Sequence, residues 1–277
     1  QKSMPLQVRA IGNVEAYSTV QVKARAAGEL MRVNFREGQD VNKGDLLFAL
    51  DPRPYETALE AARANLQRDT ALAKKAGDDV LRYTELFKDN LVSKNDFERV
   101  LTTADAARAT VAADNAALEN AKLQLGYCSI NAPVSGRTGG LLADIGNLIK
   151  ANDDKPLVVI NQIQPVYVSF SVPEQSLSVI RKYMVSGKLL VEAIISDVDG
   201  VPADGVLTFI DNAVDTSTGT IKLKATFPNK DKRLWPGQFV NIAMTLTTQP
   251  DALVVPSQAL LSGQQGQYLF VVRDDNT

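Results

Sequence analysis

One short motif occurs twice in this chain, and a long helix-forming segment separates the two copies. Gly28 and Gly38 lie ten residues apart in AAGELMRVNFREGQDVNKGDLLFALD, and Gly136 and Gly146 lie ten residues apart in APVSGRTGGLLADIGNLIKANDDKPLVVIN. A glycine allows backbone bends that other residues resist. Two glycines at a fixed spacing within strand-like sequence therefore predict that the same turns are built twice.

Apolar residues also match between the two copies. Val33 and Val41 in the first copy correspond to Leu141 and Ile149 in the second, at the same offset as the glycines. Two half-motifs that are alike but far apart in sequence are expected to pair in space and to complete one small sheet. The segment between them is then extruded from that sheet as a projection.

The intervening segment, residues 55–125, has the composition of a helix. It contains no proline and a single glycine, Gly77, and it is rich in alanine, leucine, glutamate, lysine and arginine, which are good helix formers. Apolar residues recur every seven positions in its first half at Leu59, Leu66, Ala73, Val80 and Phe87, with Ala62, Ala76 and Tyr83 on a companion seam. The second half repeats the pattern at Phe97, Ala104, Val111, Leu118 and Leu125, with Val100, Ala107 and Ala121 beside them. Heptads sustained through two successive helices predict an antiparallel coiled-coil hairpin.

The sequence also predicts the length of the hairpin and places two acidic residues in its seams. Each helix has roughly 30 residues or more, so at about 1.5 Å of rise per residue the hairpin should project roughly 45–50 Å. Each companion seam also contains one aspartate, Asp69 in the first helix and Asp114 in the second.

The turn of the hairpin is predicted within KDNLVSKNDFE, residues 88–98. Asn90 suits the end of the first helix, because asparagine tolerates the left-handed backbone conformation found there. Ser93 followed by Asp96 three residues later resembles a capping arrangement for the start of the second helix. A helix cap is a sufficient role for Ser93 and requires no partner protein.

Composition excludes several classes of activity. The chain has no histidine, which removes Ser-His-Asp and Cys-His catalysis and histidine metal sites. Its one cysteine, Cys128, permits no internal disulfide and no cysteine zinc cluster, and its apolar setting predicts a buried thiol. A net charge of -2 offers no general attraction to nucleic acid. We therefore expect no catalytic residue, no bound metal, no cofactor and no nucleic-acid partner.

Around the predicted turn the sequence resembles a known family. Arg82, Leu86 and Ser93, in RYTELFKDNLVSKNDFE, match in type and spacing the hairpin-tip motif of periplasmic adaptor subunits, also called membrane fusion proteins, of RND-type tripartite multidrug efflux pumps in the HlyD-like superfamily. In that family the arginine, leucine and serine engage the outer-membrane channel. The resemblance implies the same role for these three residues. Because Val80 and Phe87 already occupy the seam, we expect Leu86 to be exposed.

The two half-motifs resemble the lipoyl or biotinyl carrier fold, in which two similar half-sheets are joined by a hairpin that presents a modified lysine. Here the helical segment stands in place of that hairpin. Lys43 and Lys150 lie within the halves, but neither has the sequence setting of a carrier lysine. We therefore expect no covalent lipoate or biotin.

After residue 163 the pattern changes to strands. In VYVSFSV and TIKLKATF apolar and polar residues alternate, which predicts half-buried strands of a small barrel or sandwich. LLVEAIIS, VLTFIDN and QFVNIAMTL supply further strands, and PEQSLSVIRKYMVSG between them predicts a short helix. Turn residues stand at Asp199-Gly200, and ALVVPSQALL and YLFVVRDDNT near the end predict two more strands. The TSTGTIKLKATFPN…LWPGQFV stretch resembles the β-barrel domain of the adaptor family.

The resemblance covers essentially the whole sequence and implies a mainly β, elongated, multidomain chain nested out and back. Residues 1–18 and 250–277 are expected to form part of a membrane-proximal β-domain, and residues 19–54 and 126–162 a split lipoyl-like domain. Residues 55–125 are expected to form the hairpin, and residues 163–249 the β-barrel. The implied partners are an inner-membrane RND transporter, an outer-membrane channel of the TolC type, and further copies of the chain in trimers or hexamers. The resemblance also implies a periplasmic location, with attachment to the inner membrane by a lipid or N-terminal anchor not present in this sequence. The sequence has no run of roughly 18 apolar residues and so predicts no membrane-spanning helix.

Three other functions remain as alternatives. An adaptor for type I secretion or metal export is one, although the absence of histidine and the single cysteine argue against soft-metal handling. A lipoyl or biotinyl carrier subunit is less favoured. For an unrelated enzyme, acidic pairs such as Asp78-Asp79 and Asp153-Asp154 are adjacent in the chain, whereas acid–base catalysis needs groups that converge in a cleft.

Overall fold

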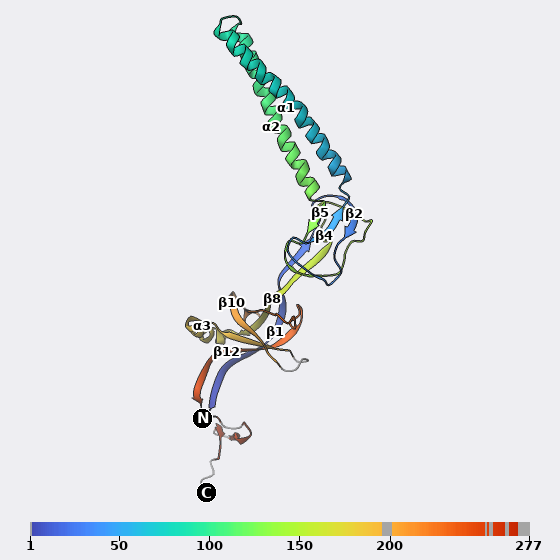
Figure 1. The fold of residues 1–277 in the computed structure, drawn as a ribbon. Helices are drawn as coiled ribbons and strands as arrows, with labels where there is room; N and C mark the ends of the chain where they lie inside the picture. The colour runs from blue at the N-terminus through green and yellow to red at the C-terminus, as the bar shows by residue number, and fades with distance from the viewer. Residues whose placement is uncertain (1, 196–200, 253, 255–256, 264–265, 271–277) are drawn as a thin grey trace. The chain divides into compact units, whose positions relative to one another are not determined.

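The computed structural model describes residues 2–195, 201–252, 254, 257–263 and 266–270. They divide into two compact units, Thr19–Gln162 and the combination of Gln1–Ser18 with Ile163–Thr277. Strands β1 (Lys2–Val22) and β8 (Val158–Pro173) each contribute residues to both units. Figure 1 shows the course of the chain through these elements.

In the unit 19–162 the two copies of the repeated motif pair with each other. A four-stranded sheet has the order β5 (Ser129–Asn131), β4 (Leu46–Leu50), β2 (Gly28–Val33) and β7 (Leu148–Ile149). Strand β2 of the first copy pairs with β7 of the second, and β3 (Asp40–Val41) of the first pairs with β6 (Gly136–Thr138) of the second. The residue pairs Gly28–Ile149 and Val41–Gly136 are equivalent under the constant offset of the repeat. The expected pairing of the two halves is confirmed.

The repeated glycines have different structural roles. Gly38 and Gly146, the second glycine of each copy, have φ values of 72° and 89°, a region that side chains other than glycine rarely adopt. Gly136 instead lies so close to β8 that a Cβ atom there would stand 2.6 Å from the backbone oxygen of Asn161. At Gly28 a Cβ atom would make only ordinary contacts, the nearest at 3.6 Å. The two copies therefore share the turn at Gly38 and Gly146, whereas Gly28 and Gly136 have different packing environments.

A compact apolar core lies between the paired halves. Leu30, Leu47 and Phe48 are fully buried, and the ring of Phe35 packs edge-on against Phe48 with the ring centroids 5.3 Å apart. Cys128 is 3 % exposed, and burial raises the pKa of its thiol, so the predicted buried thiol is confirmed. This core anchors both ends of the segment that separates the halves.

That segment forms two long antiparallel helices, α1 (Arg53–Lys88) and α2 (Lys94–Gly126), which lie side by side in Figure 1. Helix α1 begins two residues before the predicted position, because Pro54 stands in its first turn, where the missing N–H of proline costs no hydrogen bond. The Tyr55 hydroxyl near the helix start donates to the Ala27 carbonyl at 2.7 Å and ties the helix to the sheet.

Two contacts establish the register of the hairpin. Near the turn, the rings of Phe87 and Phe97 stack with centroids 5.0 Å apart. Farther along, the carboxyl groups of Asp69 and Asp114 on the companion seam lie close enough for each to shift the pKa of the other. Ala104, in the main heptad run of the second helix, is only 1 % exposed. The seams predicted from the heptads thus face each other.

The other unit is built on a closed ring of strands. Its order is β1, β12 (Phe239–Ala252), β9 (Leu190–Ile194), β10 (Ala203–Asp215), β11 (Thr220–Phe227) and β8, and β1 also pairs with β8. Of the predicted barrel or sandwich, the structure forms a barrel. The expected alternation is present, since Ile221, Leu223, Ala225 and Phe227 are all buried. The predicted helix is α3 (Leu177–Ser186), preceded by the short 3-10 helix η1 (Glu174–Ser176).

Near the end of the chain the structure differs from the prediction. Of the stretch predicted as a strand, 252–261, the described residues include the last residue of β12, a short 3-10 helix, η2 (Ser257–Ala259), and the first residue of β13 (Leu261–Gly263). Strand β13 pairs with β14 (Gly266–Tyr268). Pro256 has no N–H to donate to a strand ladder, so an apolar run through it is a poor strand. The predicted turn at Asp199-Gly200 and residues 271–277 lie outside the described residues.

Candidate functional site

The hairpin turn has a defined backbone conformation. Asn90 has a φ of 57°, its N–H donates to the Phe87 carbonyl at 3.0 Å, and the Leu91 N–H donates to the Leu86 carbonyl at 2.8 Å. This pair of bonds around a left-handed residue is the Schellman arrangement, which satisfies carbonyls at the end of a helix. The prediction that Asn90 ends the first helix is confirmed.

Ser93 caps the second helix, as predicted. Its hydroxyl oxygen accepts the backbone N–H of Asp96 at 3.1 Å, and the hydroxyl donates to a carboxylate oxygen of Asp96 at 2.7 Å. The bond from Ser93, helped by Arg99, holds the pKa of Asp96 below its usual value. The side chain of Ser93 therefore has a structural role before any partner is considered.

The other two predicted tip residues lie on the last turns of α1. Arg82 is exposed and forms an ion pair with Asp79 one turn earlier in the helix. Leu86 is half-buried, so the expectation that it is exposed is wrong. The neighbour Phe87, placed on the seam, is 38 % exposed even though it stacks on Phe97, because the hairpin ends there and little chain remains to cover it.

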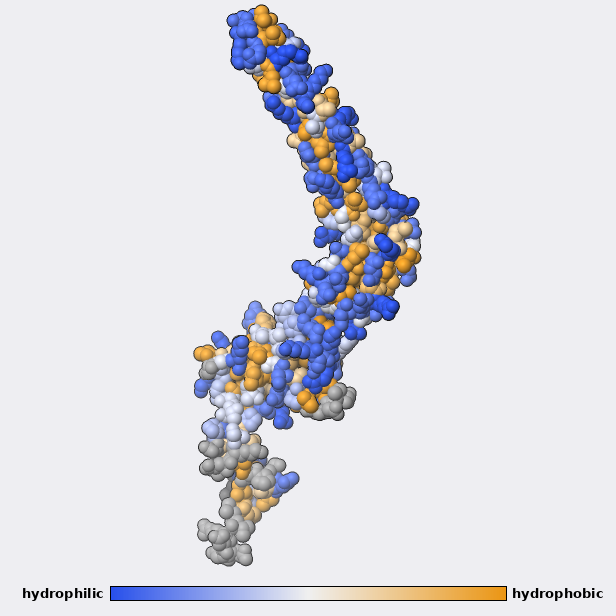
Figure 2. Space-filling view, in the orientation of Figure 1, coloured by the Kyte–Doolittle hydropathy of each residue, from blue (hydrophilic) through white to orange (hydrophobic). Residues whose placement is uncertain are grey.

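One tip residue escaped the sequence reasoning. Leu91, in the turn between the helices, has 69 % of its surface exposed. The sequence does contain a signal for its exposure: Leu91 is an apolar residue in a polar turn, outside both heptad runs, so no seam can bury it. Figure 2 shows hydrophobic atoms at the far end of the hairpin, beside hydrophilic ones.

Most charges near the turn are paired within their own helix. The ion pairs are Arg82–Asp79, Lys88–Glu85, Lys94–Glu98 and Arg99–Asp96. Pairs of this spacing neutralise each other locally, although each contributes little stability on an exposed surface. The tip therefore presents an apolar side chain among charges that are mostly compensated, with the exposed Asp89 outside these ion pairs.

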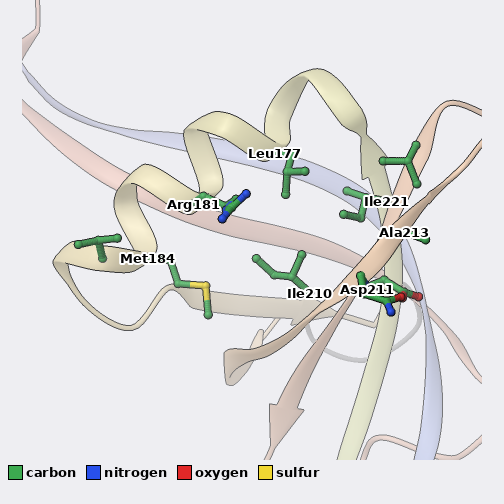
Figure 3. Close-up of a pocket in the computed structure, with 10 residues that line it drawn as sticks. Leu177, Arg181, Met184, Ile210, Asp211, Ala213 and Ile221 are labelled. Carbon is green, nitrogen blue, oxygen red and sulfur yellow. Dashed lines mark hydrogen bonds between the residues drawn. The ribbon is translucent and has the colours of Figure 1, made fainter.

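The barrel unit carries a separate groove of about 470 Å³ between α3 and β10 (Figure 3). Its lining is mainly apolar, with Leu177, Met184 and Ile210 among the residues, and Arg181 and Asp211 add opposite charges. The pairing of β10 with β11 is irregular between Ile210 and Val214. The groove has no nucleophile paired with a base, so its residues do not form a catalytic arrangement of the usual kind.

The described residues contain no group of three or more histidine, cysteine, aspartate or glutamate side chains able to hold a metal ion.

Neither lysine of the carrier-like halves stands on a connecting hairpin. Lys43 lies in the loop between β3 and β4, where its backbone N–H donates to the Ser135 hydroxyl at 2.8 Å. Lys150 is exposed directly after β7. The connection between β4 and β5, where a carrier would present its lysine, is formed by α1 and α2.

Comparison with known proteins agrees with this architecture. Residues 18–161 match the RND MFP barrel-sandwich hybrid domain, and residues 165–248 match the β-barrel domain of RND MFPs. The chain belongs to the RND membrane fusion proteins. The family predicted from the tip motif is thus confirmed, and the fold is mainly β, with a barrel-sandwich hybrid and a helical hairpin.

Two relatives of this membrane fusion protein are named multidrug resistance protein MdtA. The one from Proteus mirabilis is 42 % identical over 277 residues, which cover 100 % of this chain and 67 % of the relative. The one from Pectobacterium carotovorum is 40 % identical over 275 residues, 99 % of this chain and 67 % of the relative. A MacA–MexA chimeric protein containing the Pseudomonas aeruginosa MexA α-hairpin domain aligns with a TM-score of 0.68 at 23 % identity, covering 100 % of this chain and 94 % of that one. That likeness concerns the fold.

Proposed function

We propose that this membrane fusion protein is the periplasmic adaptor of an RND multidrug efflux pump and links an inner-membrane RND transporter to a TolC-type outer-membrane channel. The observation that carries the proposal is that, in the barrel-sandwich hybrid, a helical hairpin replaces the short hairpin that presents the lysine in a carrier domain. Two carrier-like halves pair as in a cofactor domain, but α1 and α2 stand where the modified lysine would be presented. The domain therefore serves to hold a projecting arm.

The proposed domain arrangement is the nested one. Residues 1–18 with 250–277 form part of a membrane-proximal domain, residues 19–54 with 126–162 the lipoyl-like domain, residues 55–125 the hairpin, and residues 163–249 the barrel. The two compact units support its outline, because the break between them falls at Ser18–Thr19 and Gln162–Ile163. The pairing of Lys2 with Ala252 supports the approach of the two arms of the chain.

Mechanistically, the adaptor performs no bond chemistry and acts by assembly. Copies pack side by side into a trimeric or hexameric ring, and their hairpins form a helical sleeve around the export path. The tips then meet the channel through Arg82, Leu86 and Ser93. The conformation of the turn supports this role, since the Asn90 termination and the Ser93 cap give the hairpin a well-ordered end.

The proposed location is the periplasm, with the chain attached to the inner membrane by a lipid or an N-terminal anchor. Among the described residues, no helix has the length and apolar character needed to cross a membrane. The names of the relatives favour small drug-like compounds as the exported substrates. A metal-export or type I secretion role is less favoured, because the relatives at 42 % and 40 % identity are named multidrug resistance proteins.

Complementation tests the proposal. In cells that lack their own adaptor but retain the matching transporter and channel, the full protein is expected to restore export of a fluorescent dye such as ethidium. Replacing Leu86 or Arg82 with aspartate or glutamate should abolish export without loss of folded protein. Leu123→Asp is the matched control, because Leu123 is 52 % exposed but lies near the other end of α2. Normal export by the Leu86 and Arg82 variants would remove the tip assignment.

A further inference from the structure

Leu91 is more exposed than the other apolar residues at the hairpin turn. It is 69 % exposed, whereas its neighbours Leu86 and Val92 are half-buried. It also lies beyond the last turn of α1 and before the cap of α2, so neither seam can bury it. Its side chain therefore loses most of its favourable burial unless a partner supplies an apolar surface.

The position of Leu91 is held by the backbone beneath it. Its N–H donates to the Leu86 carbonyl at 2.8 Å, and Asn90, in the left-handed conformation, directs the chain across the end of α1. Because the bond uses backbone atoms, it is kept whatever side chain stands at position 91. The same holds at position 86, where the backbone carbonyl accepts this bond whatever the side chain is.

The charges around Leu91 indicate the kind of surface it meets. Lys88 is paired with Glu85, and Lys94 is paired with Glu98, both within their own helices. Asp89 is exposed and forms no ion pair among the described residues, so one carboxylate near Leu91 is not balanced and disfavours an acidic partner surface. The paired charges leave little for a strongly basic surface to attract. An uncharged apolar recess can bury the 69 % of Leu91 that is exposed in the free chain.

We propose that Leu91 is a direct contact of the hairpin tip and inserts into an uncharged apolar recess at the periplasmic end of the outer-membrane channel. This inference rests on the proposed adaptor function and adds a contact residue to its tip. The backbone carbonyl at position 86 holds Leu91 in place, and the Leu86 side chain is a separate proposed contact. Burying a leucine side chain contributes about 1.5–3 kcal/mol, so its loss should weaken each tip contact roughly 10- to 100-fold.

The test compares two leucines of equal exposure. Leu81 on the outer side of α1 is also 69 % exposed, so Leu81→Asp introduces the same change away from the turn. The variants Leu91→Asp, Leu91→Ala, Leu91→Met and Leu81→Asp are made in the full chain. Each is measured for dye export, for crosslinking to the channel in cells from a photoreactive residue in place of the exposed Asn95, and for thermal unfolding.

We expect Leu91→Asp to abolish export and crosslinking, Leu91→Ala to weaken both, and Leu91→Met to retain them, with unchanged unfolding in every variant. Leu81→Asp should behave as wild type. Normal export by Leu91→Asp, or equal loss in Leu81→Asp, overturns the inference.

Failure of the adaptor function itself has a different signature. If Leu91→Asp exports normally while Leu86→Asp fails, only the Leu91 contact is wrong. If the wild-type chain restores no export and forms no crosslink to the channel, the proposed function is wrong and the inference falls with it.

Discussion

The role of Ser93 as a helix cap can be separated from any role as a contact. In Ser93→Ala the backbone N–H of Asp96 loses its acceptor at 3.1 Å, and the hydroxyl that donated at 2.7 Å is removed. Loss of a serine N-cap costs about 1 kcal/mol, within a range of about 0.5–2. Because every 1.4 kcal/mol is tenfold in an equilibrium, the first turn of α2 should open about five times more often.

Hydrogen exchange is the appropriate assay, because the loss is confined to one end of the hairpin. The backbone amides of residues 95–97 should exchange about fivefold faster in Ser93→Ala, while those near Ala104 should keep their rates. The pKa of Asp96 should also rise toward its usual value, because the bond from Ser93 is the largest cause of its lowering. An NMR titration of the carboxyl group measures that change.

The control is Ser93→Thr, which keeps a hydroxyl able to donate and accept. Its amide exchange at residues 95–97 should match the wild type. If Ser93→Ala exchanges no faster than Ser93→Thr, or if protection is lost along the whole hairpin, the capping argument is refuted. If export falls in Ser93→Thr although the cap is intact, the result would instead indicate that the channel contacts the serine side chain directly.

Three further predictions concern stability. Burial and the Asp69 carboxylate raise the pKa of Asp114, so the stability it contributes is present at low pH and is lost as the pH rises through its folded-state pKa. Asp114→Asn should therefore unfold at a higher temperature than wild type at pH 7, with the difference shrinking toward pH 4; a pH-independent difference contradicts this. Gly136→Ala places a Cβ atom 2.6 Å from the Asn161 oxygen and should cost about 1–3 kcal/mol in urea unfolding, whereas no cost would show that β8 moves freely. Gly77→Ala, with nothing within 4 Å of the added atom, should stabilise α1 by about 0.5–1 kcal/mol, and a loss of helicity by circular dichroism would count against it.

Periodic features of the sequence were sufficient to predict much of the fold. The constant offset between Gly28–Val41 and Gly136–Ile149 predicted that the halves pair, because equivalent strands of two similar half-sheets complete each other. The heptads predicted both seams of the hairpin, since the seven-residue period brings the same face of each helix to its partner. The cap at Ser93 was readable because it depends on residues only three positions apart.

Exposure at the tip could not be predicted in the same way. Heptad position assigned Phe87 to the seam and left Leu86 outside, yet Leu86 is half-buried and Phe87 is 38 % exposed. The reason is that burial depends on what lies opposite each residue, and at the end of a hairpin one side of the seam has no further chain. The closure of the barrel by β1 and β8 was likewise undecided, because alternation predicts a buried face but not which strands become neighbours.

The sequence by itself determined that two half-motifs hold a coiled-coil arm, and it identified the family through Arg82, Leu86 and Ser93. These properties follow from local spacing, which the chain carries in every conformation. Only the tertiary structure decided that Leu91 is the most exposed apolar residue of the turn and that Asp69 and Asp114 meet in the seam. Both depend on two helices, distant in sequence for most of their length, ending and packing at particular residues.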